Sequence, residues 1–421
     1  MKSITTATRR KSLQVKWLMP TYKFLGIGVV LRRISLPLSN PVAMLCLRDN
    51  VHVLPSDRIS RVFRFYNHLT NECRLDLNRV EQHCWQLSGP GNRMLLFRLS
   101  ALVLFGTLIA CTPQVQLQGL TVAEPILNGG TITTSDGYEL PLRMWKAAQP
   151  PRAIVLALHG FNDYSNAFAE PAAWWSRAGI TTYAYDQRGF GLSANPHIWP
   201  GTDAMVKDLH EAARVIGMRH PGVPLYLLGL SMGGAVVMVA DARDPPVSGI
   251  AGQILVGPAV WGRATMPLPH RIALWVGVRT MPHNSVSGRG LRIIPSDNIE
   301  MLRALGRDPL VIKETRIDAL YGLVNLMDEA LASSPLTRTP TLVLYGARDE
   351  IIPRGPTIRM LSNLSAPHRV ALYRRGYHML LRDLQADVVW RDIAAWIDDQ
   401  SVQLPSGAEI DQPERLNTEE N

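Results

Sequence analysis

The chain has 421 residues, 46% of them hydrophobic, and a formal net charge of +9. This length and apolar content predict one large globular domain with additional material. Residues 1–93 hold 15 of the 44 Lys and Arg residues and 5 of the 35 Asp and Glu residues, which leaves 29 basic and 30 acidic residues in the rest of the chain. Because the positive charge belongs to the front segment, the main domain is not expected to bind nucleic acid.

Residues 1–93 are expected to be an upstream extension outside the folded domain. Their apolar runs are broken, and Lys16, Pro20 and Lys23 interrupt the most apolar of them, so a membrane span is not expected. We interpret this segment as the product of a misassigned start, with translation beginning at Met94.

The segment after residue 93 has the layout of a secretory signal. Arg98 supplies a positive charge, and the 12 residues from Leu99 to Ala110 are uncharged and mostly apolar. This run is too short for a spanning helix. Its end, Leu108-Ile109-Ala110-Cys111, resembles a bacterial lipobox, in which the cysteine is acylated and becomes the mature N-terminus.

This resemblance implies a lipoprotein signal peptide over 94–110, lipidation of Cys111 and a linker over 111–124. The protein would then be a membrane-anchored lipoprotein of a bacterial cell envelope. The alternative is an ordinary apolar helix with a chance cysteine, which would imply a cytoplasmic protein.

Residues 125–400 alternate between predicted strands and predicted helices. A hairpin over Thr131–Lys146, with Asp136-Gly137 as its turn, opens this region. The alternation is typical of an α/β fold, with a mainly parallel sheet covered by helices on both faces. Residues 401–421 are expected to form a polar tail.

The alternation stops between the predicted strand Gln253–Gly257 and residue 336. Residues 262–336 contain helix-prone apolar pieces, which we interpret as a helical cap over the carboxyl edge of the sheet, where it would select substrates. Some apolar residues there recur at helical spacing, which fits either an acyl-chain tunnel or plain core packing. They are Ile312, Leu320, Leu323, Leu326 and Met327.

Gly229-Leu230-Ser231-Met232-Gly233 lies between the predicted strand Val223–Leu228 and the predicted helix Gly234–Ala240. A strand, G-x-S-x-G and a helix in this order form a nucleophile elbow. The tight turn raises the Ser231 hydroxyl above the sheet and brings backbone N–H groups towards it. A glycine-rich turn without reactive function is the alternative that the pentapeptide alone leaves open.

Two further polar residues follow predicted strands. Asp349 comes after Pro340–Tyr345, and His378 comes after Arg369–Tyr373. Open α/β sheets place their sites at the carboxyl ends of strands. A serine hydroxyl needs a neutral imidazole to remove its proton and a carboxylate to orient that imidazole. The three residues therefore form a candidate catalytic set.

His159-Gly160-Phe161 follows the predicted strand Ala153–Leu158. In this type of site, one oxyanion donor is the N–H after the nucleophile and the other comes from such an upstream loop. The backbone N–H groups of Met232 and Phe161 are the expected donors. The side chains of His159, Asp186 and Arg188 are expected to organise loops.

These motifs together resemble the monoacylglycerol lipase and lysophospholipase branch of the α/β-hydrolase superfamily, often grouped as serine aminopeptidase S33-like. The residues that carry the resemblance are His159-Gly160, Asp186-Gln187-Arg188-Gly189-Phe190-Gly191, Gly229-Leu230-Ser231-Met232-Gly233-Gly234, Asp349 and His378. It covers about residues 125–400. Leu230 and Gln187 depart from it, since many members have His at both positions.

The resemblance implies a serine hydrolase that cleaves carboxylic esters of lipids through an acyl-enzyme, with Ser231, His378 and Asp349 as the triad. A peptidase, a thioesterase or a lactonase would use the same triad, and a non-catalytic lipid-binding lipoprotein is the alternative from another class. No metal ion or other cofactor is expected. The expected partners are an ester or lipid substrate and a membrane surface, while the oligomeric state stays open.

Overall fold

The structure is a computed structural model that describes residues 112–290 and 292–417. The expected extension over 1–93, the expected signal peptide over 94–110 and Cys111 lie outside the described residues. No helix among the described residues is long and apolar enough to cross a bilayer.

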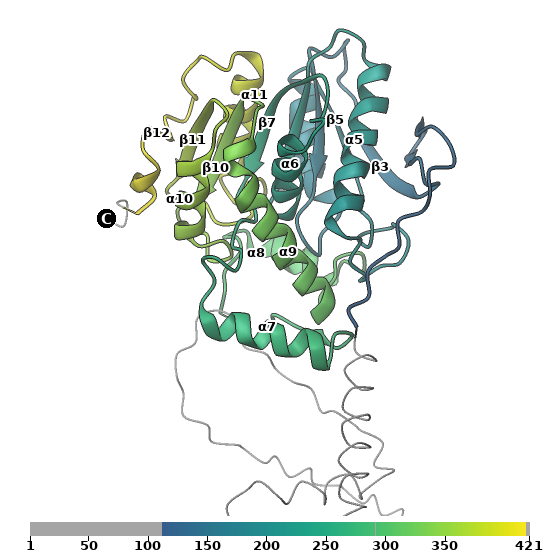
Figure 1. The fold of residues 1–421 in the computed structure, drawn as a ribbon. Helices are drawn as coiled ribbons and strands as arrows, with labels where there is room; N and C mark the ends of the chain where they lie inside the picture. Colours follow the sequence, from purple (N-terminus) through teal and green to yellow (C-terminus); the bar gives the residue numbers. More distant parts are fainter. Residues whose placement is uncertain (1–111, 291, 418–421) are drawn as a thin grey trace, which may run out of the picture.

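A ten-stranded sheet runs through the described chain (Figure 1), in the order β1-β2-β3-β5-β4-β6-β7-β10-β11-β12. The six strands from β5 to β11 in this order are parallel to one another, while β1, β2, β3 and β12 pair antiparallel. The strands are β1 (Ile126–Asn128), β2 (Thr131–Thr133), β3 (Glu139–Trp145), β4 (Ala153–Leu158), β5 (Ile180–Tyr185), β6 (Leu225–Leu230), β7 (Ile250–Val256), β10 (Thr341–Gly346), β11 (His368–Tyr373) and β12 (Glu409–Ile410). The predicted, mostly parallel sheet is confirmed.

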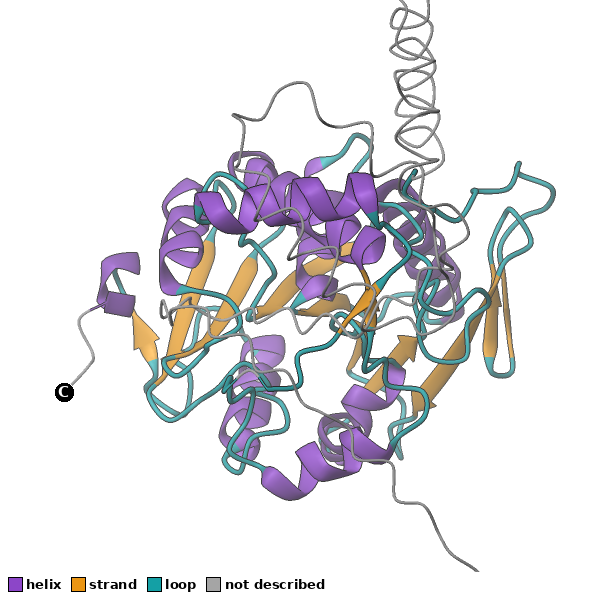
Figure 2. Ribbon diagram, turned by 90° about the horizontal axis from the view of Figure 1, so that it is seen from below, coloured by secondary structure: helices purple, strands orange, loops and turns teal. Residues whose placement is uncertain are grey.

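Helices cover both faces of this sheet (Figure 2). Helices α4 and α11 pack on one face, and α5, α6, α9 and α10 pack on the other. The helices are α4 (Ala169–Arg177), α5 (Thr202–Arg219), α6 (Met232–Ala242), α7 (Leu268–Thr280), α8 (Ile299–Arg307), α9 (Ile317–Ser333), α10 (Arg354–Asn363) and α11 (Ala386–Asp398).

The central strands are apolar along their whole length because both of their faces are buried. In β4, Ile154, Leu156 and Leu158 join the core under α5 and α6. The intervening Ala153, Val155 and Ala157 join the core under α4 and α11. Since successive strand residues point to opposite faces, a continuous apolar run is the pattern of a strand covered twice. The polar residues that follow such strands collect at one edge of the sheet.

The cap is narrower than the 262–336 expected from the sequence. Helix α9 packs against α5, α6 and α7, and its Leu326 and Met327 are buried in the main core. The rest of this segment, residues 262–316, is the cap. It contains helices α7 and α8 and a small antiparallel pair of strands, β8 (Ser285–Val286) and β9 (Thr315–Arg316). Figure 1 shows α7 set apart from the sheet. The core-packing interpretation of Leu326 and Met327 is therefore correct.

The sheet also continues beyond residue 400, where a polar tail was expected. Strand β12 pairs with the edge strand β11, and Leu404 and Leu416 are buried. These apolar residues are widely spaced in a polar stretch, so no periodic pattern marks them. Residues 401–417 are thus a mostly exposed polar stretch that also contributes a short strand and two buried leucines to the fold.

A buried arginine fastens the turn between β2 and β3 to the sheet. The Arg188 guanidinium donates two hydrogen bonds to Asp208 on α5 and two to Asp136 in the turn, at 2.7–2.9 Å. It also lies over the Tyr138 ring, 4.2 Å from its centroid. Burial alone would raise the pKa of Asp136, but the hydrogen bonds and charge of Arg188 outweigh burial and hold this pKa well below its usual range. Arg188 has the structural role expected from the sequence.

Replacing this arginine should destabilise the fold strongly. Arg188→Met leaves the buried carboxyl groups without a cationic partner, which costs about 3–5 kcal/mol of unfolding free energy. The control is Arg214→Met, which removes an exposed ion pair with Glu124 and should cost less than about 1 kcal/mol. Urea unfolding at pH 7 measures both.

The destabilisation should also depend on pH. With its lowered pKa, Asp136 stabilises the folded state above the ordinary Asp pKa, and this stabilisation is lost as the pH falls through the folded-state value. The difference in unfolding free energy between the native protein and Arg188→Met should therefore become smaller at acid pH. Equal urea midpoints for the native protein and Arg188→Met at pH 7 would contradict the structural role of Arg188.

Candidate active site

Ser231 occupies a strained turn between β6 and α6. Its φ of 52° and ψ of −111° are unusual for a residue other than glycine. A Cβ on Gly229 would lie 2.4 Å from the Gly234 Cα, and one on Gly233 would lie 2.2 Å from the Leu158 carbonyl oxygen. Only glycine fits at these two positions, which explains the G-x-S-x-G spacing. The structure thus contains the predicted elbow geometry.

The loop after β7 holds this turn in place. The Ser231 N–H donates to the Val256 carbonyl, and the Ala259 N–H donates to the Ser231 carbonyl, both at 2.9 Å. Gly257, with φ of 50°, lies between these two contacts. A Cβ there would lie 3.4 Å from His378 Nδ1 and 3.5 Å from Asp349 Oδ2. One short loop therefore touches both the serine turn and the histidine–aspartate pair.

His378 and Asp349 are hydrogen-bonded to each other, with 2.7 Å between Nδ1 and Oδ2. The other carboxylate oxygen, Oδ1, accepts from the N–H groups of Ile351 and Ile352 at 2.8 and 2.9 Å. Asp349 is almost fully buried and His378 is 8% exposed. A carboxylate bound at Nδ1 keeps that nitrogen protonated and leaves Nε2 with its lone pair.

The loop after β4 passes beside Ser231. A Cβ on Gly160 would lie 3.5 Å from the Ser231 Cβ. Phe161 is the next residue in the chain, so its backbone also lies near the serine. His159 is buried, with its Nδ1 2.8 Å from the Gly160 carbonyl and its Nε2 3.0 Å from the Gln187 N–H. Burial lowers the pKa of His159. A neutral imidazole satisfies both contacts, so His159 organises the loop as expected.

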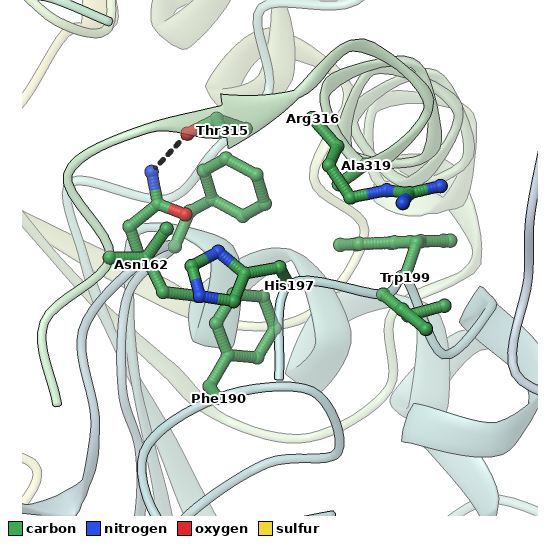
Figure 3. A pocket seen from close by; sticks show the side chains of 10 residues that line it. Asn162, Phe190, His197, Trp199, Thr315, Arg316 and Ala319 are labelled. Carbon is green, nitrogen blue, oxygen red and sulfur yellow. Dashed lines mark hydrogen bonds between the residues drawn. The ribbon is translucent and has the colours of Figure 1, made fainter. Parts of the chain in front are cut away.

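A small cavity lies beside Phe161 (Figure 3). The Phe161 ring meets the Phe190 ring edge-on, with centroids 5.6 Å apart, and lies 6.2 Å from the Trp199 ring. The cavity is lined by Phe161, Asn162, Phe190, His197, Ile198, Trp199, Ile312, Thr315, Arg316 and Ala319. Of the five residues considered for a tunnel, Ile312 is the one that lines it.

The sequence did not identify most of this lining. Asn162, His197, Trp199 and Arg316 come from three stretches far apart in the chain, and none belongs to a motif. The positive φ values of Asn162 and His197, 65° and 71°, mark tight turns that only the structure reveals. In the sequence, Trp199 stands out only as a large aromatic residue shortly after Gly189-Phe190-Gly191, and such a residue is too common to indicate a site.

The assembled groups suit acyl transfer. Nucleophilic catalysis by serine requires an exposed hydroxyl, a base and oxyanion donors. The site offers a hydroxyl on a strained turn, an imidazole bound at Nδ1 and backbone N–H groups at the start of a helix. Within residues 112–290 and 292–417, no three His, Cys, Asp or Glu side chains gather as a metal site would need.

Known proteins with similar sequences identify the family of this chain. The chain matches the family described as serine aminopeptidase, S33, over residues 149–385. It is 28% identical over 279 residues to a monoacylglycerol lipase of Mycolicibacterium smegmatis, covering 62% of this chain and 93% of the relative. It is 25% identical over 272 residues to the monoglyceride lipase of Rattus norvegicus, covering 63% of this chain and 89% of the relative.

A solved structure shares the fold. The monoacylglycerol lipase of Paleococcus ferrophilus superposes with a TM-score of 0.53 at 23% identity, covering 62% of this chain and all of that one. The sequence match over residues 149–385 therefore places the chain in the serine aminopeptidase S33 family of the α/β-hydrolases, with relatives among the monoacylglycerol lipases.

Proposed function

We propose that this protein is a serine hydrolase that cleaves carboxylic esters of lipids, of the monoacylglycerol or lysophospholipid type. The observation that carries the proposal is the hydrogen bond between His378 and Asp349, which lies next to the Gly257 loop that also holds the strained Ser231 turn. The names of the relatives, monoglyceride lipase and monoacylglycerol lipase, support the lipid ester as substrate.

The reaction starts with the attack of Ser231 Oγ on the acyl carbonyl, while His378 Nε2 takes the hydroxyl proton. Asp349 stabilises the imidazolium that forms. His378 then protonates the leaving alcohol, and the bond between the carbonyl carbon and the alcohol oxygen breaks. A water molecule attacks the acyl-enzyme with His378 as base, which releases the fatty acid and restores Ser231.

Two backbone N–H groups stabilise the negative oxygen of the tetrahedral intermediates in this proposal. Met232 is the first residue of α6, so its N–H has no acceptor within the helix. The Phe161 N–H belongs to the loop whose Gly160 approaches Ser231. Donors aimed at a developing charge are typically worth a factor of about 10²–10³ each in rate.

Serine labelling tests the nucleophile. A fluorophosphonate probe should label the native protein and fail to label Ser231→Ala, whose ester hydrolysis should fall by a factor of about 10⁴ or more. Ser176→Ala is the matched control, since the Ser176 hydroxyl bonds only within α4. Absence of labelling in the native protein would favour a non-catalytic lipid-binding lipoprotein.

The choice of substrates separates the related activities. Monoacylglycerols, lysophospholipids and p-nitrophenyl esters of varied chain length should be cleaved, and peptide amides and thioesters of the same acyl groups should be poorer substrates. A higher kcat/KM for an amide than for the ester would indicate a peptidase with the same triad, and a higher kcat/KM for a thioester would indicate a thioesterase.

We also propose that Cys111 carries a lipid anchor in a bacterial cell envelope. The support is the resemblance of Leu108-Ile109-Ala110-Cys111 to a lipobox. The next residue, Thr112, lies against the cap, with its carbonyl oxygen 3.2 Å from a ring nitrogen of His283 just after α7. An anchor at Cys111 would therefore leave the fold beside α7.

Metabolic labelling with an alkyne fatty acid tests the anchor. The native protein should be labelled and sediment with membranes, and Cys111→Ser should lose the label. Equal labelling of both would overturn the lipidation site. Peptides from residues 10–90 in the mature protein would overturn the interpretation of that segment as an extension.

The cap presents a surface suited to an anionic bilayer. On α7, the side chains of Leu268, Ile272, Trp275 and Val276 recur at the spacing of one helix face and are 42–61% exposed. The stretch over residues 262–296 contains five Arg and no Asp or Glu. Apolar side chains beside arginines bind bilayers with negative headgroups.

Vesicle binding tests this surface. In the Cys111→Ser background, the protein should bind vesicles that contain phosphatidylglycerol, and Ile272→Glu should weaken binding about tenfold because it sets a charge in the apolar face. Binding should also weaken with added salt. Met218→Glu, at an exposed position near the end of α5, is the control and should bind as before. Equal loss in both variants would contradict a specific role of α7.

A further inference from the structure

The loop that follows Gly160 is hydrogen-bonded to the cap. The Asn162 side-chain Nδ2 donates to the Thr315 hydroxyl at 2.6 Å, and the Asn162 carbonyl accepts from the Ile312 N–H at 2.9 Å (Figure 3). Asn162 has φ of 65°, a conformation that asparagine adopts more readily than most residues. Because Asn162 directly follows Phe161, these contacts fix the direction of the chain at Phe161.

A second contact joins the same loop to α8. The Tyr164 hydroxyl donates to Asp308 Oδ2 at 2.8 Å, and Asp308 directly follows the last residue of α8. Burial and this carboxylate raise the pKa of Tyr164 to about 12, so the hydroxyl keeps its proton across the physiological range. The C-terminal end of α8 is therefore bound to the loop that carries Phe161.

The other end of α8 is bound to the loop that carries His378. Asn298 caps the helix by accepting from the Met301 N–H, and its Nδ2 donates to the Arg382 carbonyl at 3.0 Å. Two residues before Asn298, the Ser296 hydroxyl donates to Asp383 at 2.6 Å. Arg382 and Asp383 follow His378 by four and five residues, so this end of the cap and the histidine loop form one unit.

A buried ion pair closes the ring. The Arg382 guanidinium pairs with Asp163, which lies between Asn162 and Tyr164. The loop after β4, the loop after β11 and α8 are thus joined pairwise, and each junction involves polar groups that are at least partly buried. A shift of the cap would have to move the two loops with it or break these bonds.

We propose that the cap positions the oxyanion hole, with Asn162 as the positioning residue that holds the Phe161 N–H through Thr315. This inference rests on the proposed function, in which Phe161 donates to the oxyanion. Stabilisation of the transition state depends steeply on donor geometry. Loosening this contact should therefore slow the chemical step and leave substrate binding little changed.

The test removes the contact from each side. Asn162→Gly keeps the positive φ without strain, and Thr315→Val removes the partner hydroxyl. Each should lower kcat for a short p-nitrophenyl ester about tenfold with KM within about twofold, because a donor is displaced rather than lost. The double variant should be no slower than either single variant, since both remove one interaction. Thr315→Ser keeps the hydroxyl and should restore the native kcat.

A control in the cap separates positioning from general damage. Thr265→Val removes a hydroxyl that bonds to Gly262 within the same turn, and its kcat should stay native. The Asn162 and Thr315 variants should still be labelled to completion by the fluorophosphonate, but about tenfold more slowly. Native kcat in both variants, or losses confined to KM, would overturn the positioning role. A native protein that is neither labelled nor active would overturn the proposed function instead.

Discussion

Parallel strand pairing is the constraint on which the rest of this structure depends. Because β4, β6, β7, β10 and β11 run the same way, the residues that follow them emerge at one edge. Groups separated by more than 200 residues in the chain, such as Gly160 and His378, are brought to the edge of the sheet that carries the Ser231 turn by the parallel pairing of their strands. Side chains then adjust this arrangement: His159 braces one loop, and Asp349 sets the tautomer of the histidine.

Much of this edge could be predicted from the sequence. A buried parallel strand is a short apolar run, and the polar or glycine-rich residues just after it are visible as interruptions. The predicted strand Ala153–Leu158, for example, is β4 with the same first and last residues. The glycines of the elbow have a steric reason that involves few neighbours. Gly229 contacts Gly234 in the same turn, and Gly233 contacts Leu158 on the adjacent strand β4.

The cap and the cavity could not be predicted in the same way. The contacts of Asn162 with Thr315 and of Tyr164 with Asp308 join residues about 150 positions apart and follow no period. Helical spacing also fails to distinguish a buried face from a substrate-lining face, so Leu326 in the core and Ile312 at the cavity carried the same signal. Strand β12 was missed because a two-residue pair at the edge of a sheet needs no extended apolar pattern.

The path of the chain before β1 has a consequence for how the molecule would sit on a membrane. The Gln114 N–H donates to Asp318 at the start of α9, and the Gln116 N–H donates to the Trp199 carbonyl. An anchor at Cys111 would therefore have only a few residues of slack, far less than the width of the domain. The side of the domain that holds Gln114 would then stay within a few residues' reach of the bilayer surface. The protein's encounters with lipid esters would then follow lateral diffusion in the bilayer rather than collision from solution.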